Sequence, residues 1–277
     1  MPGMESSPRV SPPATPSPAA TLVLLRDGAA GAVEALLLQR HGKSKFAAGD
    51  HVFAGGKVEA EDIPNDVERY CRGLTAQEAA SRLGGEFAGR EALAYWVGAI
   101  REAFEEAGIL LACTADGAFV RFTPDNRDRF NEYRSAGQRS NQAFFPMLRA
   151  ERLTLATDRL TYFAHWITPE ENPIRFDTRF FAAVAPSGQE ATVDDHEIVA
   201  SRWLTPAGAL DALHRQEISL RAPTIKNLEI IAAAMPGGTA SEVVASLHGR
   251  SVPTIRPRIL AVDGRRVAVL PGDPRWY

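Results

Sequence analysis

The chain has 277 residues, of which 45% are hydrophobic, so it can bury a substantial core in one large or two small domains. Its 31 lysines and arginines nearly balance 34 aspartates and glutamates, and the net charge of -3 argues against nucleic acid or an anionic membrane as the main partner. No apolar run reaches the roughly 20 residues of a membrane-spanning helix, and no signal-peptide pattern is seen at the N-terminus.

The cysteine content is low. Only Cys71 and Cys113 occur, and neither belongs to a CxxC or Cys/His pattern that would indicate a zinc site or a disulfide framework. We interpret both as ordinary buried or half-buried thiols. Free thiols fit a reducing compartment, so we expect a soluble cytoplasmic protein.

The first elements are a tail and a hairpin. Residues 1–20 are rich in proline and serine and are expected to form a disordered tail. Thr21 to Arg26 and Val33 to Arg40 are short apolar runs bracketed by Asp-Gly and glycine, which predicts two paired strands. A brief strand in "HVFAGG" should end at Gly55 and Gly56, where the backbone can approach a ligand.

Helical patterns fill the middle of the chain. Thr75 and Glu78 form a capping box for a short helix that stops at Gly84 and Gly85. A long helix follows and ends at Gly108. Two further helices are predicted in "DNRDRFNEYRSAG" and "NQAFFPMLRAERL", the second broken or started by its proline.

The second half returns to strands. Aromatic and β-branched residues predict three of them, over Leu160 to Thr168, Arg175 to Ala185 and Ile198 to Thr205. Helices are then expected from Pro206 to about Arg215, in "TIKNLEIIAAAM" and in "TASEVVASLHG", and a closing hairpin should turn at Asp263 and Gly264. This order predicts an α/β (α+β) fold with a mixed sheet flanked by helices.

The long helix carries an unusual acidic cluster. Glu102, Glu105 and Glu106 share one sector, opposite a core stripe that consists of Val97, Ile100, Phe104 and Gly108. Carboxylates four residues apart repel by a few tenths of a kcal/mol, so a cation is expected nearby. Arg101 stands four residues before Glu105 and can pair with it. Spacing alone leaves a plain solvated acidic face equally open.

Two segments of the chain resemble the Nudix box. "REAFEEAGI" from Arg101 matches its second half, Arg-Glu-apolar-x-Glu-Glu-x-Gly-apolar, and "FAGGKVEAED" from Phe53 resembles its first half, with Ala54 where proline is usual. Asp62 stands where the family has a glutamate that pairs with the arginine. The arginine itself is at position 101 instead of 70, so the box contains an insertion of 31 residues.

The resemblance implies a fold and a domain plan. We expect a Nudix-type α/β/α sandwich with a mixed β-sheet, whose hydrolase domain covers residues 21–227. A helical insertion should occupy about residues 63–93, inside the box. Residues 228–277 should form C-terminal helices and a hairpin packed on the same domain.

The resemblance also implies the reacting groups. The carbonyl of Gly55 and the carboxylates of Glu102, Glu105 and Glu106 would bind Mg²⁺ or Mn²⁺, hard cations that prefer oxygen ligands. Glu102 is a metal ligand or the base that activates water, and Arg101 and Glu105 complete the catalytic helix. The family often adds a later acid; of Asp194, Asp195 and Glu197 we choose Glu197, with a solvated loop acid as the equal alternative.

A second signature points to a substrate. "LLLQRHGKSKFAAGDHVFAGG" resembles the coenzyme A signature of some Nudix hydrolases, although Lys45 replaces an arginine and His41 a small residue. The matching positions are Leu36, Leu37, Arg40, Lys45, Gly49, Phe53, Gly55 and Gly56. Arg40 and Lys45 would then meet substrate phosphates, or they merely decorate a loop. Arg175 and Arg179 either face substrate or pair across a sheet edge with Asp177, and for Asp177 we favour the pairing.

These features predict a metal-dependent hydrolase that splits a diphosphate bond in coenzyme A or acyl-coenzyme A, nearest the acyl-coenzyme A diphosphatase branch. One alternative is a nucleoside diphosphate-linked substrate such as NADH, ADP-ribose or a nucleotide sugar. Another is a nucleotide-binding regulator without turnover, which Ala54 and Asp62 would support. A protein-interaction scaffold built on the helices from Pro206 onward is a third. A homodimer is expected by likeness to the family only.

Overall fold

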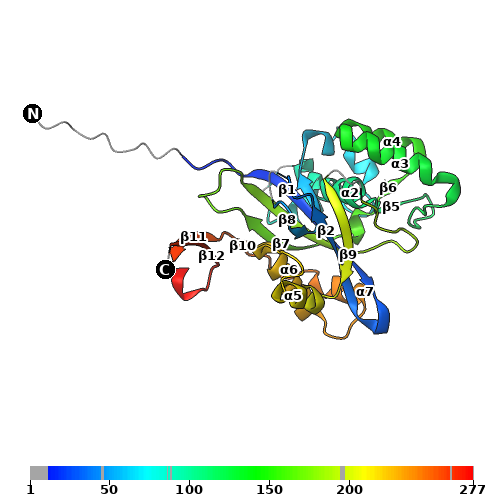
Figure 1. Ribbon diagram of the computed structural model, residues 1–277. Helices are drawn as coiled ribbons and strands as arrows, with labels where there is room; N and C mark the ends of the chain where they lie inside the picture. The colour runs from blue at the N-terminus through cyan, green and yellow to red at the C-terminus, as the bar shows by residue number, and fades with distance from the viewer. Residues whose placement is uncertain are drawn as a thin grey trace, which may run out of the picture.

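The computed structural model describes residues 12–44, 47–85, 87, 89–193, 197–262 and 264–276. In this part of the chain, eight strands form one mixed sheet that helices cover on both faces (Figure 1). The predicted α/β sandwich is therefore confirmed. The predicted site and turn residues Lys45, Asp194, Asp195 and Asp263 lie outside the described residues.

The sheet is organised around its first strand. Its members are β1 (Ser17–Asp27), β2 (Val33–Arg40), β3 (His51–Val52), β4 (Ala54–Lys57), β7 (Thr161–Ile167), β8 (Phe176–Val184), β9 (Ile198–Leu204) and β10 (Thr254–Ile255). β1 runs parallel to β8 on one side, while on the other it pairs antiparallel first with β4 and then with β2. This shared edge brings the predicted glycine pair, which belongs to β4, into the middle of the sheet.

The first strand starts earlier than predicted. β1 begins at Ser17, within the segment expected to be a disordered tail, and residues 17–20 pair with β8. The composition of that segment did not indicate a strand. Its own apolar content does not hold it in place; backbone hydrogen bonds to a strand more than 150 residues later do so.

Helices form a layer on each face of the sheet. One layer contains α1 (Ala76–Arg82), α2 (Leu93–Ala107), α3 (Pro124–Arg139) and α4 (Phe144–Glu151), with the short pair β5 (Ala112–Cys113) and β6 (Thr154–Leu155) beside them. The other contains α5 (Pro206–His214), α6 (Ala222–Ala234) and α7 (Ala240–Leu247) (Figure 1). Side chains alternate between the two faces along each strand, so one strand contributes to both layers. Leu22 and Leu24 of β1 pack toward α2, while Val23 and Leu25 pack toward the second layer.

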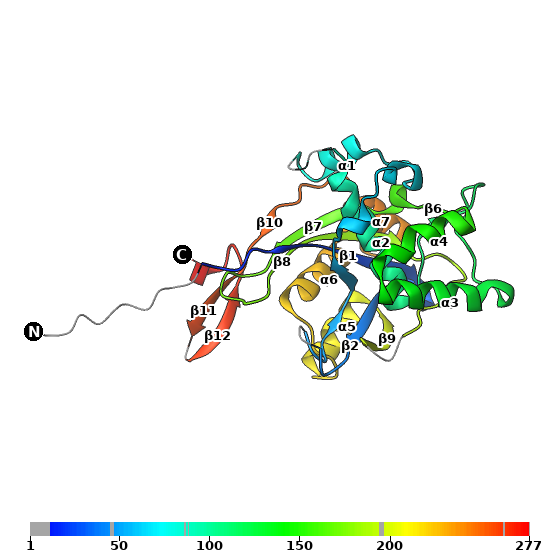
Figure 2. The same cartoon turned by 90° about the horizontal axis from the view of Figure 1, so that it is seen from above.

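The insertion within the box folds as part of the α2 layer. Its helix α1 begins at the predicted capping box, in which the Thr75 hydroxyl accepts from the Glu78 N–H and Glu78 accepts from the Thr75 N–H. Leu74, Ala79 and Leu83 join the same core cluster as α2. Figure 2 shows α1 lying next to α2 at one end of the layer. The insertion therefore extends the core around the site.

The C-terminal segment returns to the sheet. β10 pairs parallel with β7, and β11 (Arg258–Val262) and β12 (Arg265–Val269) form the predicted hairpin, with Gly264 at φ 75°. Cys71 is half-buried, Cys113 is buried and both are free thiols, as expected. Among the described residues, no helix combines the length and apolar character needed to cross a membrane.

Candidate active site

The catalytic helix of the box is α2, and it is buried almost all round. Every residue from Leu93 to Ala107 is buried except Glu102, which is half-buried. As predicted, Val97, Ile100 and Phe104 join the core while the three glutamates line cavities, but the glutamate side of the helix is not solvated, because β4 and α3 cover it. A solvated acidic face is thereby excluded. The helix ends as predicted at Gly108, in the left-handed conformation with φ 68°.

Arg101 organises one side of the acidic cluster. Its side chain is only 1% exposed, and it donates to Asp62 through Nε (2.7 Å) and Nη2 (3.0 Å). Nη1 donates to Glu102 (2.8 Å) and to Glu105 (3.1 Å), and Nη2 also reaches the carbonyl of Lys57 (2.9 Å). Asp62 thus takes the pairing role of the glutamate usual in the box, and Arg101 fixes two carboxylates of the cluster.

The glycine pair meets the cluster from β4. The N–H of Gly55 donates to Oε2 of Glu106 at 2.9 Å. A Cβ on Gly56 would lie 2.5 Å from a carboxylate oxygen of Glu102, whereas a Cβ on Gly55 would strike the backbone of β1. Both positions therefore require glycine, Gly55 for strand pairing and Gly56 for the close approach of Glu102.

Helix α3 closes the cluster from the other side. Arg134 donates to the carbonyls of Glu105 (2.9 Å) and Glu106 (2.8 Å), and Gln138 donates to the same carbonyl of Glu105 (2.7 Å). These carbonyls belong to the last turn of α2, where no intrahelical donor is available. The sequence analysis missed both residues; their i, i+4 spacing on one face of a very polar helix was the only signal.

Burial and mutual repulsion shift the pKa values of the three carboxylates upward. Burial raises the pKa of Glu102 to about 7, against the attraction of Arg101. The pKa of Glu105 is raised mainly by burial. That of Glu106 is raised well above its usual value, by burial and then by the charge of Glu102. The site therefore holds negative charge at a cost that a bound cation would relieve.

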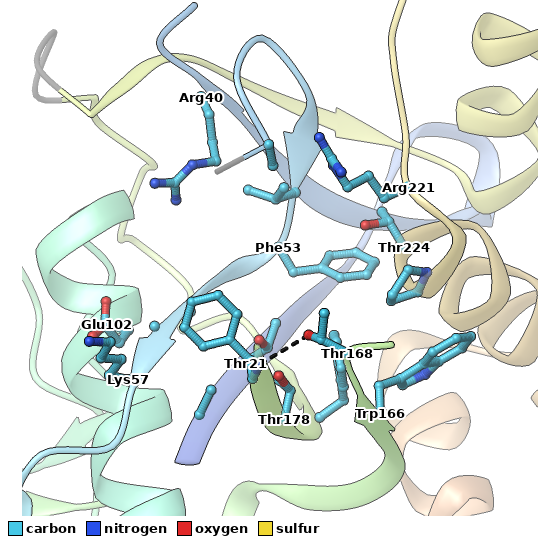
Figure 3. A pocket seen from close by; sticks show the side chains of 18 of the residues that line it. Thr21, Arg40, Phe53, Lys57, Glu102, Trp166, Thr168, Thr178, Arg221 and Thr224 are labelled. Carbon is cyan, nitrogen blue, oxygen red and sulfur yellow. Dashed lines mark hydrogen bonds between the residues drawn. The ribbon is translucent and has the colours of Figure 1, made fainter. Parts of the chain in front are cut away.

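A cavity of about 690 Å³, which we call the main cavity because the glycine pair also lines it, opens in front of these carboxylates (Figure 3). Glu102 and Lys57 lie at one end of the view in Figure 3, Phe53 lies near the middle, and Trp166 lies at the other end. The apolar part of the lining comprises Phe53, Trp166, Phe176, Phe180, Pro257 and Ile259. The size of the cavity falls within the range of small-molecule sites.

A second cavity, of about 800 Å³, lies on the α3 side of the same carboxylates. Glu102, Glu105 and Glu106 line both cavities. The remaining lining is polar except for Val193, and it comprises Asn131, Arg134, Ser135, Gln138, Arg139, Thr192 and Glu197. The acidic cluster thus separates a largely apolar cavity from a polar one.

Other predicted site residues join the cluster. Arg40 forms ion pairs with Glu106 (3.5 Å) and with Glu197, and Glu197 lines both cavities. Phe53 is buried and lines the main cavity. Arg221, which the sequence analysis did not single out, lines the cavity from the start of α6 and pairs with Asp50 at 2.6 Å.

Arg175 does not join the site. Its guanidinium donates to the carbonyls of Thr168 (3.1 Å) and Ala14 (2.6 Å), and it is not among the described residues that line either cavity. This side chain fastens the start of β1 to the sheet, and the expected contact of Arg175 with substrate stays a prediction. Asp177 pairs with Arg179 and His165, as favoured from the sequence.

The donor chemistry of the cluster fits a hard divalent cation. Oε1 of Glu105 is buried and has no hydrogen-bond partner among the described residues. The expected cage is not preformed, since no three acidic, histidine or cysteine side chains converge on one point within the described ranges. Arg101 engages Glu102 and Glu105, while Gly55 and Arg40 engage Glu106.

Known proteins are similar to this chain in sequence and in fold. A chain from Xenopus laevis named acyl-coenzyme A diphosphatase NUDT19 is 26% identical over 269 residues, which cover 87% of this chain and 70% of that one. The Gallus gallus protein of the same name is 29% identical and aligns with 70% of this chain and 60% of its own length. A crystal structure of a NUDIX hydrolase from Alicyclobacillus acidocaldarius superposes with a TM-score of 0.60 at 25% identity, covering 85% of this chain and 94% of that chain.

The match also holds at the level of a family. The sequence model of the NUDT19 Nudix domain matches residues 11–231, which span both halves of the box, the insertion between them and all of the sheet except β10. The chain therefore belongs to the NUDT19 Nudix domain family, a branch of the Nudix hydrolases.

Proposed function

We propose that this chain is a divalent-metal-dependent hydrolase that cleaves the diphosphate bond of coenzyme A or an acyl-coenzyme A. The observation that carries the proposal is the placement of Glu102, Glu105 and Glu106, which are held by Arg101 and Gly55 in a cavity that aromatic and aliphatic side chains also line. The names of the two vertebrate relatives favour acyl-coenzyme A among the diphosphates. Cleavage would release 3′,5′-ADP and a 4′-phosphopantetheine product.

The metal would be Mg²⁺ or Mn²⁺, and Nudix hydrolases generally use divalent metals. Glu102, Glu105, Glu106 and the carbonyl of Gly55 would hold it. When bound, such an ion offsets the charge of a diphosphate and lowers the pKa of an attacking water. The residues of the chain supply the rest: Arg101 orients Glu102 and Glu105, and the N–H of Gly55 orients Glu106.

Cations beside the carboxylates would bind the substrate phosphates. Arg40 faces the main cavity with its side chain 16% exposed, and it can exchange its pairs with Glu106 and Glu197 for a phosphate. Lys45, assigned a similar role by the coenzyme A signature, remains a prediction. Glu197 is proposed as the additional acid, because it reaches the cluster through Arg40.

A substrate panel tests this proposal. The purified chain is incubated with Mn²⁺ and coenzyme A, NADH or ADP-ribose, and the products are separated by chromatography. We expect 3′,5′-ADP from coenzyme A, its loss with a chelator and its return with added Mg²⁺ or Mn²⁺. Cleavage of NADH and ADP-ribose but not of coenzyme A would remove the coenzyme A assignment and favour a nucleoside diphosphate-linked substrate.

A nucleotide-binding regulator without turnover is the second candidate. It is favoured by the ion pairs that Arg101 and Arg40 form with the carboxylates, because a metal would have to displace some of these pairs. Tight binding of coenzyme A or ADP-ribose with no product under any divalent metal would support it. A cytoplasmic location and a homodimer stay predictions, and the free thiols of Cys71 and Cys113 are consistent with the first.

A further inference from the structure

The C-terminal hairpin forms one wall of the main cavity. Ile259 of β11 and Ala268 of β12 are directly paired across the hairpin, so their side chains share one face, and both line the cavity together with Pro257. These residues follow the last position of the family match, residue 231. No part of the Nudix box or of the coenzyme A signature requires them.

Several contacts hold the hairpin beside the sheet. The preceding strand β10 pairs with β7, the strand that supplies Trp166 to the cavity. The Thr254 hydroxyl lies 2.8 Å from Nδ1 of His165 in β7. Val269 at the end of β12 is fully buried, and Ile255 packs against the core cluster of the second helical layer. The hairpin wall is thus anchored to an element that also lines the cavity.

The cavity combines a charged and an apolar lining. Glu102 and its neighbouring carboxylates belong to the first, and Phe53, Trp166, Phe176 and Ile259 belong to the second. Hydrolysis of a diphosphate needs no apolar surface, so the apolar lining is suited to a different part of the substrate. The second cavity, with its polar lining, offers no comparable surface among the described residues. An apolar chain attached to the substrate therefore has one favourable place to go.

We propose that the β11–β12 hairpin is the specificity wall for the acyl group of the substrate, with Ile259 and Ala268 contacting the acyl chain. This inference rests on the proposed function, since it assigns the place of the acyl chain in the same substrate. If the hairpin has this role, an acyl chain that is long enough to reach it binds more tightly because of that contact. Free coenzyme A, which carries no acyl chain, gains nothing there.

The test uses the full-length, Mn²⁺-loaded protein and compares kcat/KM for dodecanoyl-coenzyme A with that for free coenzyme A. In Ala268→Trp the larger side chain would occupy the space proposed for the acyl chain. We expect kcat/KM for the dodecanoyl substrate to fall roughly tenfold and its KM to rise. This is the effect of excluding one or two methylene groups from apolar surface at about 0.8 kcal/mol each. The value for free coenzyme A should stay within about twofold. Val267→Trp is the control, because Val267 pairs with Leu260 on the opposite face of the hairpin and is not among the described residues that line the cavity.

The outcomes separate the two proposals. Wild-type cleavage of free coenzyme A measures the proposed function by itself, and its absence removes that function and the acyl assignment together. If the wild type is active, an unchanged ratio of the two substrates in Ala268→Trp, or an equal change in Val267→Trp, overturns the role of the hairpin. Should Ala268→Trp not fold, Ile259→Ala gives the second test, with a smaller, severalfold loss expected for the dodecanoyl substrate only.

Discussion

The guanidinium of Arg101 binds the carboxylate of Asp62 through two hydrogen bonds, of 2.7 and 3.0 Å, in a fully buried pair. The two residues flank the insertion, one before and one after it. Their pairing closes the inserted segment at its base, so the two halves of the box meet as if the insertion were absent. The cost of closing a longer loop grows only slowly with length, which is why such an insertion is tolerated.

Breaking this pair should destabilise the protein. In Asp62→Asn the buried charge of Arg101 keeps Glu102 and Glu105 but loses its bidentate partner, and we expect the free energy of unfolding to fall by about 3 kcal/mol. Urea denaturation followed by circular dichroism measures the change. Glu61→Gln, at the exposed neighbouring position, should shift it by less than about 0.5 kcal/mol. Equal stability of the two variants would contradict the role of the pair.

Removing one carboxylate of the cluster should abolish turnover without unfolding the chain. Glu106→Gln keeps an oxygen that can accept from the Gly55 N–H but loses the charge needed to bind a cation, so we expect metal-dependent hydrolysis to fall at least about 100-fold. The Mn²⁺ dependence of the rate and a thermal melting curve measure both parts. Glu91→Gln, at an exposed site just before α2, is the control and should retain activity. Normal turnover by a folded Glu106→Gln protein would refute the assignment.

Gly56 should be needed for activity more than for folding. The methyl group of Gly56→Ala would press on the carboxylate of Glu102, at 2.5 Å, and displace it, so we expect kcat to fall roughly tenfold or more. Steady-state kinetics on coenzyme A would show this. Gly42→Ala is the matched control, because a Cβ there meets nothing within 4 Å and the backbone is not left-handed. A fully active Gly56→Ala protein would show that Glu102 has no fixed position in the reaction.

The stability contributed by Asp177 should disappear in acid. Burial raises the pKa of this carboxyl, but hydrogen bonds from His165 and Arg179 outweigh burial, so the pKa is lowered overall. A lowered folded-state pKa gives stabilisation that is complete above the unfolded-state value of about 3.9 and is lost as the pH falls through the folded-state value. Asp177→Asn should therefore lower the free energy of unfolding by roughly 1–3 kcal/mol at pH 7 and progressively less below about pH 4.

Chemical denaturation of wild type and Asp177→Asn between pH 3 and 7 measures this dependence. Asp128→Asn, at an exposed site, serves as the control and should differ little from wild type at any pH. A difference between wild type and Asp177→Asn that stays constant across the range would contradict the titration of Asp177 as its source.

The local elements could be predicted from the sequence because their signals are local. The capping box of Thr75 and Glu78, the glycine that ends α2 and the strand Val33–Arg40 all lie where their residue types placed them. The box halves and the likeness they carry identified the acidic cluster and the glycine pair. Even the partner of Arg101 could be named, because Asp62 occupies a fixed position relative to the glycines.

Contacts between distant segments could not be predicted in this way. The start of β1 is held by a strand from the second half of the chain, and Arg175, expected at the substrate, is used to anchor it. Arg134 reaches the last turn of α2 only because α3 folds back across it. The i, i+4 spacing of Arg134 and Gln138 marks one face of a helix but does not name the partner of that face, and the pairing of β1 leaves no pattern in the sequence.

The sequence by itself determined the elements, because caps, glycines and strand patterns act within a few residues, and the likeness of two segments to the Nudix box pointed to the acidic cluster. Tertiary structure alone decided that the glutamates are buried and that they stand between a largely apolar and a polar cavity. It also decided that a hairpin near the C-terminus lines the first of these cavities. The physical reason is that burial and cavity shape depend on which distant surfaces meet, and each meeting is fixed by the packing of the whole sheet and its two helical layers.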